Sequence, residues 1–280
     1  MTEKNQLLPE RPGLFRALRR SPNSLPILWH LGVSHYSEKV RWALAYKGVE
    51  HERRTMPPGA HMLTALWLTR GAQVTFPILE LDGETVGGSA PIIGALETRY
   101  PDPPLYPEDP VDRRRALDFE AYFDEKVGPA VRLVGWHHML RDHDRLEKIA
   151  QESLPGPLRD IGAVRAGATR LAGTFVGLRF RVSGEEAESR ARATVLEGID
   201  RLESTLDGRD YLFGDAFSVA DLTVASLLYP MVLPPEGPRL PGAPDSAQPF
   251  RDELRARPFW GWVERTFARH RARAPAPAPT

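Results

Sequence analysis

A proline stands where a short β-strand is expected to begin. Residues 74–83 read Val-Thr-Phe-Pro-Ile-Leu-Glu-Leu-Asp-Gly, and the proline of this segment is Pro77. Proline has no backbone N–H to donate to a sheet and is normally excluded from central strands, so we expect a deliberate bend at Pro77. One form of that bend is a cis peptide bond, which leaves the neighbouring backbone groups free for a ligand.

The residues on both sides of Pro77 predict a small domain that mixes strands and helices. Asp82-Gly83 favours the tight turn of an antiparallel hairpin, and Gly48 is placed to end a helix in the left-handed conformation. The expected order of elements describes a thioredoxin-like domain over residues 25–101, whose parallel crossover should be right-handed. The expected elements are strand 27–31, helix 37–47, strand 49–55, helix 60–68, hairpin strands 76–81 and 85–86, and helix 89–100.

Beyond a linker at 101–104, the chain is expected to be helical. Asp109-Pro110 gives a helix cap followed by proline at the first helical position, and Ser218 with Asp221 forms a capping box. Gly128-Pro129 is expected to kink or divide a helix. The fold class is thus α/β plus all-α. The further expected parts are an N-terminal arm at 1–24, an all-helical domain at 105–272, an irregular loop at 230–249 and a disordered tail at 273–280.

Composition excludes several classes of function. The chain has 37 basic and 37 acidic residues, so its formal net charge of zero disfavours nucleic acids and anionic membranes as partners. It contains no cysteine, which excludes disulfides, thiolate metal sites and a cysteine nucleophile, so any thiol chemistry must use a borrowed thiol.

The same sequence has no segment expected to enter or cross a membrane. The longest uncharged stretch, 222–235, contains Pro230 and is too short to span a bilayer. The N-terminus lacks the apolar core of a secretory signal. We therefore expect a soluble cytoplasmic protein. The arginine-rich and proline-rich composition suggests a GC-rich bacterial genome.

Four motifs together resemble the glutathione S-transferase superfamily. They are Ser-His-Tyr-Ser-Glu-Lys-Val-Arg-Trp-Ala-Leu-Ala-Tyr-Lys-Gly-Val at 34–49, Phe-Pro-Ile-Leu at 76–79, Gly-Ser-Ala-Pro-Ile-Ile at 88–93 and the capping box at 218–221. The similarity is continuous from about Pro26 to Tyr106 and patchier to about Pro230. The resemblance implies a thiol-binding thioredoxin-like domain, a helical substrate domain and assembly as a homodimer.

Ser34 is the residue that this resemblance makes catalytic. It occupies the position at which serine-type members of the family hydrogen-bond the glutathione sulfur and hold it as a thiolate. A free thiol has a pKa of about 8.5, and a helix N-terminus lowers it. A charge-assisted hydrogen bond is worth about 1.5–3 kcal/mol, or roughly one to two pKa units. The alternative is that Ser34 or Ser37 only caps the helix.

Other thiol-binding residues follow from the same resemblance. Ser89 is expected to cap the helix that opens at Ala90, where free amides suit the γ-glutamyl carboxylate. Phe76 would present its backbone N–H and C=O to the cysteinyl part, although it is equally compatible with a core position. Gly88 replaces the usual acidic or amide residue and Pro91 removes a donor, so the thiol is glutathione or another small thiol. The expected thiol-binding residues are Phe76, Pro77, Gly88, Ser89 and Ala90.

The resemblance also implies an electrophile pocket between the domains, in a region where this sequence has several aromatic residues. Tyr36, Tyr122 and Trp136 are the candidates, and the alternative is that they belong to the helix start or to the core. His137 and His138 lack the spacing of a helical zinc pair, so we expect no metal.

The sequence thus predicts an enzyme that activates a low-molecular-weight thiol, with glutathione as cosubstrate, for attack on a small hydrophobic electrophile. Isomerisation, dehalogenation and ether cleavage remain open as reactions of the same site. A noncatalytic protein that binds a hydrophobic ligand or a protein partner in the cleft is the alternative from another class.

Overall fold

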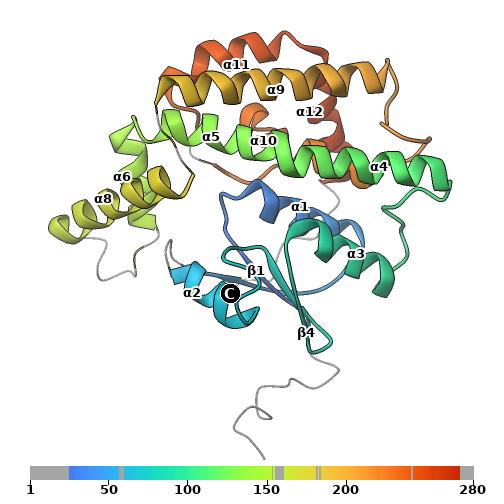
Figure 1. The fold of residues 1–280 in the computed structure, drawn as a ribbon, viewed down its shortest axis with the longest axis horizontal. Coiled ribbons are helices and arrows are strands. Elements are labelled where there is room, and N and C mark those ends of the chain that lie inside the picture. Colours follow the sequence, from blue (N-terminus) through green and yellow to red (C-terminus); the bar gives the residue numbers. More distant parts are fainter. Residues whose placement is uncertain are drawn as a thin grey trace, which may run out of the picture.

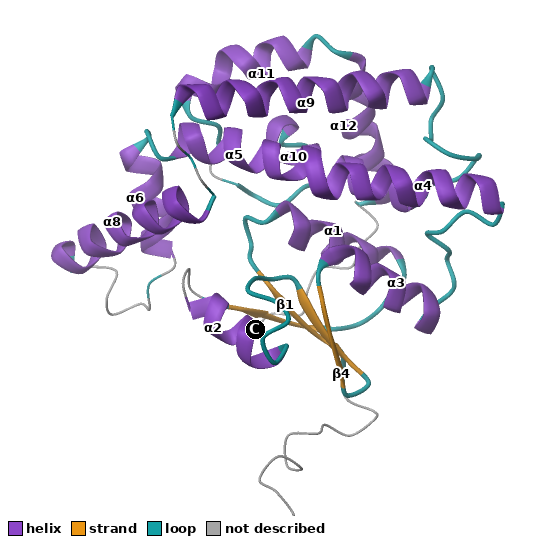
Figure 2. Cartoon of the chain, in the orientation of Figure 1, coloured by secondary structure: helices purple, strands orange, loops and turns teal. Residues whose placement is uncertain are grey.

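The computed structural model describes residues 25–56, 60–152, 154, 161–180, 182, 184–240 and 242–271. The expected N-terminal arm and C-terminal tail lie outside these residues. A small sheet with its helices forms one part of the molecule, and a larger group of helices forms the other (Figure 1; Figure 2). Helices α1 (His35–Tyr46) and α3 (Ser89–Arg99) lie between the sheet and the larger helical part, so the start of α1 faces both.

The N-terminal part is built on a mixed four-stranded sheet, counted over the described residues, with the order β2-β1-β3-β4. β1 and β2 are parallel, whereas β3 is antiparallel to both β1 and β4. The hairpin turns at Asp82 and Gly83, whose φ angles of 51° and 81° confirm the predicted left-handed turn. The elements of this part are β1 (Ile27–His30), α1 (His35–Tyr46), β2 (Glu52–Thr55), α2 (Ala60–Leu68), β3 (Ile78–Leu81), β4 (Glu84–Gly87) and α3 (Ser89–Arg99).

The two faces of the sheet enter different clusters of apolar side chains. Ile27 and Trp29 of β1 pack with Ala65 of α2, while Leu28 points to the opposite face. That opposite face continues through α1 and α3 into the core of the helical part. Alternation along one strand therefore joins the sheet to α2 on one side and to the larger core on the other.

The C-terminal part is helical, as predicted. Asp109 caps its first helix with side-chain bonds to two backbone N–H groups, and Ser218 with Asp221 forms the expected capping box. The elements are α4 (Pro110–Tyr122), the π-helical turn η2 (Phe123–Val127), α5 (Gly128–Met139), α6 (His143–Glu152), α8 (Gly162–Arg179), α9 (Glu185–Leu206), α10 (Val219–Val232), η3 (Asp245–Ala247), α11 (Gln248–Arg255) and α12 (Pro258–His270).

The junction between the two parts is aromatic and ionic. Trp42 of α1 stacks on Phe217 with ring centroids 5.7 Å apart, and it contacts Phe267 of α12 at 4.4 Å. The ammonium group of Lys39, which is fully buried, lies 2.8 Å from Glu120 and 2.6 Å from Asp124. These contacts fix α1 against the helical part.

Several predicted boundaries were wrong. α1 begins two residues earlier than expected because Ser34 is the cap, and β2 begins only at Glu52. The predicted irregular loop at 230–249 contains helix at both ends. α10 runs through Pro230 to Val232, because a proline in the last turn removes one donor while the helix remains buried. α11 begins at Gln248.

Candidate functional site

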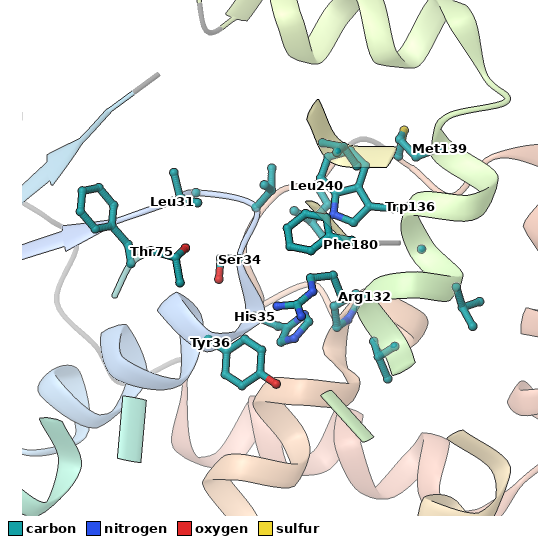
Figure 3. A pocket seen from close by; sticks show the side chains of 18 of the residues that line it. Leu31, Ser34, His35, Tyr36, Thr75, Arg132, Trp136, Met139, Phe180 and Leu240 are labelled. Atoms are coloured by element: carbon teal, nitrogen blue, oxygen red, sulfur yellow. The ribbon is translucent and has the colours of Figure 1, made fainter. Parts of the chain in front are cut away.

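A cavity of about 910 Å3 lies between the sheet and the helical part. Its lining combines the loop after β1 and the start of α1 with the segment before β3, the start of α3, and residues of α5 and α8. Figure 3 shows Ser34 between Thr75 on one side and Arg132 with Phe180 on the other. The cavity thus places residues of both parts around one serine hydroxyl.

Ser34 stands at the N-terminus of α1 and lines the cavity. Its Oγ accepts a hydrogen bond of 3.2 Å from the backbone N–H of Ser37, so the hydroxyl proton remains available to a ligand. Ser37 Oγ accepts in turn from Leu31 N–H at 3.2 Å, which holds the loop between β1 and α1. Ser34 therefore caps the helix and presents a donor to the cavity at the same time, so the two alternatives are compatible.

The Phe76–Pro77 peptide bond is cis, as the sequence suggested. The ladder between β1 and β3 begins at Ile78, so the backbone of Phe76 lies outside it. Both residues line the cavity, while the phenyl ring of Phe76 is buried against Trp29 with centroids 6.1 Å apart. The ring belongs to the core and the backbone is the part left for a ligand.

The start of α3 differs from the expectation in one residue. Gly88 is the cap, with a φ angle of 92°, and Ser89 is the first residue of the helix. The expectation that Ser89 caps this helix was wrong, because the backbone turns at the glycine, where a side chain would be strained. Gly88, Ser89, Ala90 and Pro91 all line the cavity. No side chain caps the helix.

Aromatic residues line the opposite wall, but not all those predicted. Trp136 stacks on Phe180, with ring centroids 6.4 Å apart and planes at 14°. Tyr36 also lines the cavity, and its hydroxyl donates to the carbonyl of Asp124 at 2.6 Å. Burial raises the pKa of the Tyr36 phenol, so it stays protonated. Tyr122 is not part of this lining, and its ring instead packs under Arg201, 4.3 Å from the guanidinium carbon.

Arg132 and Phe180 are cavity residues that the sequence reasoning missed. Arg132 precedes Trp136 by four residues on α5, so helical spacing places both on one face and would have been a usable signal. Phe180 follows α8, and no motif in the sequence marks it.

His35 completes the wall beside Arg132. It is buried, its ring lies 4.6 Å from that of Tyr36, and its Nε2 has no hydrogen-bond partner. Burial, with Arg132 as a second cause, lowers the pKa of His35 to about 3. The imidazole is therefore neutral at physiological pH.

Within the described ranges, no group of three or more His, Cys, Asp or Glu side chains has the geometry of a metal site. The helices of that same portion include none long and apolar enough to cross a membrane.

Two known domain families match parts of this chain. The glutathione S-transferase N-terminal domain family matches residues 28–104, and the glutathione S-transferase C-terminal domain family matches residues 185–265. The chain belongs to the glutathione S-transferase superfamily. Its fold is accordingly a thioredoxin-like domain followed by a helical domain. Residues 105–184, which include Arg132, Trp136 and Phe180, lie between the two matched ranges.

Several individual proteins are similar to this superfamily member. A probable maleylacetoacetate isomerase of Caenorhabditis elegans is 26% identical over 209 residues, which cover 74% of this chain and 79% of the relative. The maleylacetoacetate isomerase of Rattus norvegicus is 34% identical over 91 residues, or 31% of this chain and 42% of the relative.

Solved structures show the same fold. A β-etherase from Sphingobium sp. superposes with a TM-score of 0.57 at 21% identity, covering 88% of this chain and 100% of the other. A maleylacetoacetate isomerase from Anaeromyxobacter dehalogenans, with GSH bound in its active site, has a TM-score of 0.52 at 22% identity and covers 91% of this chain and 98% of the other.

Proposed function

We propose that this superfamily member is an enzyme that activates a low-molecular-weight thiol, with glutathione as the first candidate, for attack on a small hydrophobic electrophile. The observation that carries the proposal is the position of Ser34. Its hydroxyl stands at a helix N-terminus in a cavity that also holds an aromatic wall, so thiol and electrophile would meet at one point.

Two effects would lower the barrier in this site. The N-terminus of α1 and the Ser34 hydroxyl both favour the thiolate over the thiol, which raises the fraction of nucleophile at neutral pH. Holding the thiolate beside the electrophile replaces a bimolecular encounter by a reaction within one complex. Neither effect needs a metal or a general base.

The residues for the rest of the thiol follow from the same geometry. The backbone of Phe76, next to Pro77, would pair with the cysteinyl part of glutathione. The amides of Ser89 and Ala90, after Gly88, would take the γ-glutamyl carboxylate. We propose Tyr36 and Trp136 for the electrophile side, without Tyr122. A cytoplasmic homodimer is the proposed state, in line with the superfamily.

A thiol-dependent isomerase is the second candidate. Its support is that relatives named maleylacetoacetate isomerase match the chain, in one case over 79% of the relative's length. In that reaction the thiol would add to a double bond and leave again, so the thiol would act as a cofactor and not as a substrate.

A noncatalytic binding protein is the third candidate, and the start of α3 favours it. Gly88 offers no side chain and Pro91 no backbone donor to the γ-glutamyl group, which weakens any carboxylate site there. Tight binding of an apolar ligand without thiol binding would favour this candidate.

Calorimetry with glutathione and a conjugation assay on wild type, Ser34→Ala and Ser34→Thr test the proposal. The loss of one charge-assisted bond should lower kcat/KM by roughly tenfold to a hundredfold in Ser34→Ala and shift the pH–rate profile upward by about one unit. Ser34→Thr, which keeps a hydroxyl and a cap, should retain most activity. Equal rates in all three proteins would refute the role of Ser34.

A further inference from the structure

Arg132 is a largely buried cation in the wall of the cavity, and its charge is not compensated. It makes no hydrogen bond or ion pair with any residue of the described chain. Burial lowers the pKa of Arg132, Tyr36 raises it in part and Arg179 lowers it again, whereas no carboxylate contributes. Burying a cation without an anion is costly, so such a site has a strong affinity for an anionic ligand.

The surroundings of Arg132 fix how its guanidinium is presented. The guanidinium carbon lies 4.5 Å from the ring centroid of Phe180 and 5.8 Å from that of Tyr36. Contact with aromatic rings stabilises the cation through its flat faces and leaves the N–H groups at its edge unused. Those edge donors have the spacing of the two oxygens of a carboxylate.

The acidic residues of the cavity do not satisfy Arg132. Asp124 lines the cavity, but its carboxylate is bound to Lys39 at 2.6 Å. Glu125 also lines the cavity and is exposed to solvent, and it does not contribute to the pKa of Arg132. The charge of Arg132 therefore remains available to a molecule that enters the cavity.

His35 adds a second unsatisfied polar atom beside this arginine (Figure 3). Its side chain is 5% exposed, and its Nε2 is buried without a partner. Leaving a buried nitrogen unpaired costs free energy, which a ligand oxygen placed there would recover. His35 directly follows Ser34, so the subsite adjoins the position expected for the thiol sulfur.

We propose that Arg132 and His35 form a carboxylate subsite, and that the electrophile is an aromatic or unsaturated molecule with a carboxylate group. Arg132 binds the carboxylate group, while Trp136 and Phe180 contact the apolar part of the electrophile. This assignment rests on the proposed thiol-transfer function and narrows its substrates from hydrophobic electrophiles in general to carboxylate-bearing ones.

A matched pair of aryl chlorides tests the proposal. 4-Chloro-3-nitrobenzoate and its methyl ester both react with glutathione: the carbon–sulfur bond forms, the carbon–chlorine bond breaks, chloride leaves and the thiol proton passes to solvent. In Arg132→Met, kcat/KM for the carboxylate should fall roughly tenfold to a hundredfold, the loss expected for charge-assisted bonds, while that for the ester changes less than about threefold. For Arg132→Lys, which keeps the charge, kcat/KM for the carboxylate should lie between the values of wild type and Arg132→Met.

The control variant is Arg190→Met, which removes an exposed arginine of α9 and should leave both rates unchanged. An equal fall for acid and ester in Arg132→Met would overturn the proposal, because it would mean that Arg132 supports the fold of the site and not a carboxylate. Thermal unfolding of each variant identifies loss of folding.

Binding without thiol separates this inference from the proposed function. By calorimetry, wild type should bind 3-nitrobenzoate at least about tenfold more tightly than methyl 3-nitrobenzoate. That preference should vanish in Arg132→Met and persist in Arg190→Met. If wild type prefers the carboxylate over the ester but shows no turnover with any thiol, the proposed enzymatic function is refuted and the carboxylate subsite stands. The absence of a preference in wild type would overturn the subsite even if Arg132→Met does not fold.

Discussion

The two ends of the cavity are built in different ways. The end proposed for the thiol consists of the cap of α1, the cis Phe76–Pro77 bond and the start of α3, which line the cavity with backbone groups and one hydroxyl. The end proposed for the electrophile consists of side chains from α5, from α8 and the residue after it, and from the segment after α10, which lie far apart in the sequence. The first end is specified by short local motifs, whereas the second depends on how helices pack.

The family matches follow the same division. Residues 28–104 contain the whole thiol end, while Arg132, Trp136 and Phe180 fall in the stretch that neither match covers. The proposed thiol end therefore lies within a range that matches the family, whereas these three side chains of the other end lie outside both matched ranges. We expect specificity to reside in the second end.

The largest effect is expected where the two ends are joined. Lys39→Met leaves the buried carboxylate of Glu120, 2.8 Å away, and that of Asp124 without their cation. Removing one partner of a buried ion pair costs about 3–5 kcal/mol of unfolding free energy. Urea denaturation measures this loss of unfolding free energy, and Lys126→Met, on the exposed face of η2, is the control. Similar losses in both variants would show that the cluster does not hold the two ends together.

A smaller effect is expected at the contact between Tyr36 and α5. A Cβ at Gly128 would lie 2.5 Å from the Tyr36 hydroxyl oxygen, so Gly128→Ala forces one of them to move and should cost about 1–3 kcal/mol. At Gly135, on the same helix, a Cβ meets nothing within 4 Å. Gly135→Ala should therefore stabilise the protein by up to about 1 kcal/mol. Denaturation midpoints of the two variants that shift in the same direction would contradict this account.

The sheet contains a buried histidine, His30 of β1, that should make the protein sensitive to acid. Burial, followed by Arg41, lowers the pKa of His30 to about 3, and its Nδ1 accepts from Arg41 at 2.9 Å. As pH falls below 6.5, His30 becomes protonated in the unfolded chain but stays neutral in the folded protein. The free energy of unfolding therefore decreases from about pH 6.5 down to about pH 3. The slope is about 1.4 kcal/mol per pH unit.

His30→Gln removes this contribution. Its unfolding free energy should fall about 2 kcal/mol less than that of wild type between pH 7 and pH 5. The exposed histidine of α6 supplies the control variant His143→Gln. If His30→Gln shows the pH dependence of wild type, burial does not keep His30 neutral.

The smallest effect is expected at the aromatic wall. Trp136→Leu removes the stacking on Phe180, which is worth about 1 kcal/mol. KM for aromatic electrophiles should rise about fivefold, while KM for the thiol stays unchanged. Trp67→Leu, in the exposed part of α2, is the matched control. A change in the thiol KM alone would place Trp136 at the wrong end of the cavity.

Sequence reasoning recovered the elements whose cause is local. Gly48 has a φ of 65°, and the capping box at Ser218 and the turn at Asp82 formed where their residue types demanded. Ser34 was singled out by the family resemblance, and its role as the cap of α1 had been left open between Ser34 and Ser37. The role of Ser34 toward a thiol remains a prediction.

The residues that sequence reasoning missed depend on packing. Tyr122 and Trp136 have similar aromatic character, yet only Trp136 lines the cavity. The π-helical turn η2 separates the two, so periodicity counted from Tyr122 does not carry through to α5. The position of Phe180 depends on how α8 packs against α6, which no local pattern encodes.

The π-helical turn η2 also has a consequence for how the cavity can change. It holds an extra residue in an otherwise continuous helical run from Pro110 to Met139. Replacing η2 by ordinary helix, with no change in chain length, would rotate the following side chains by about 100°. Arg132 and Trp136 would then turn away from Ser34 together. A change of helix form in one turn can therefore alter which molecules the site accepts, while the sheet and its serine stay as they are.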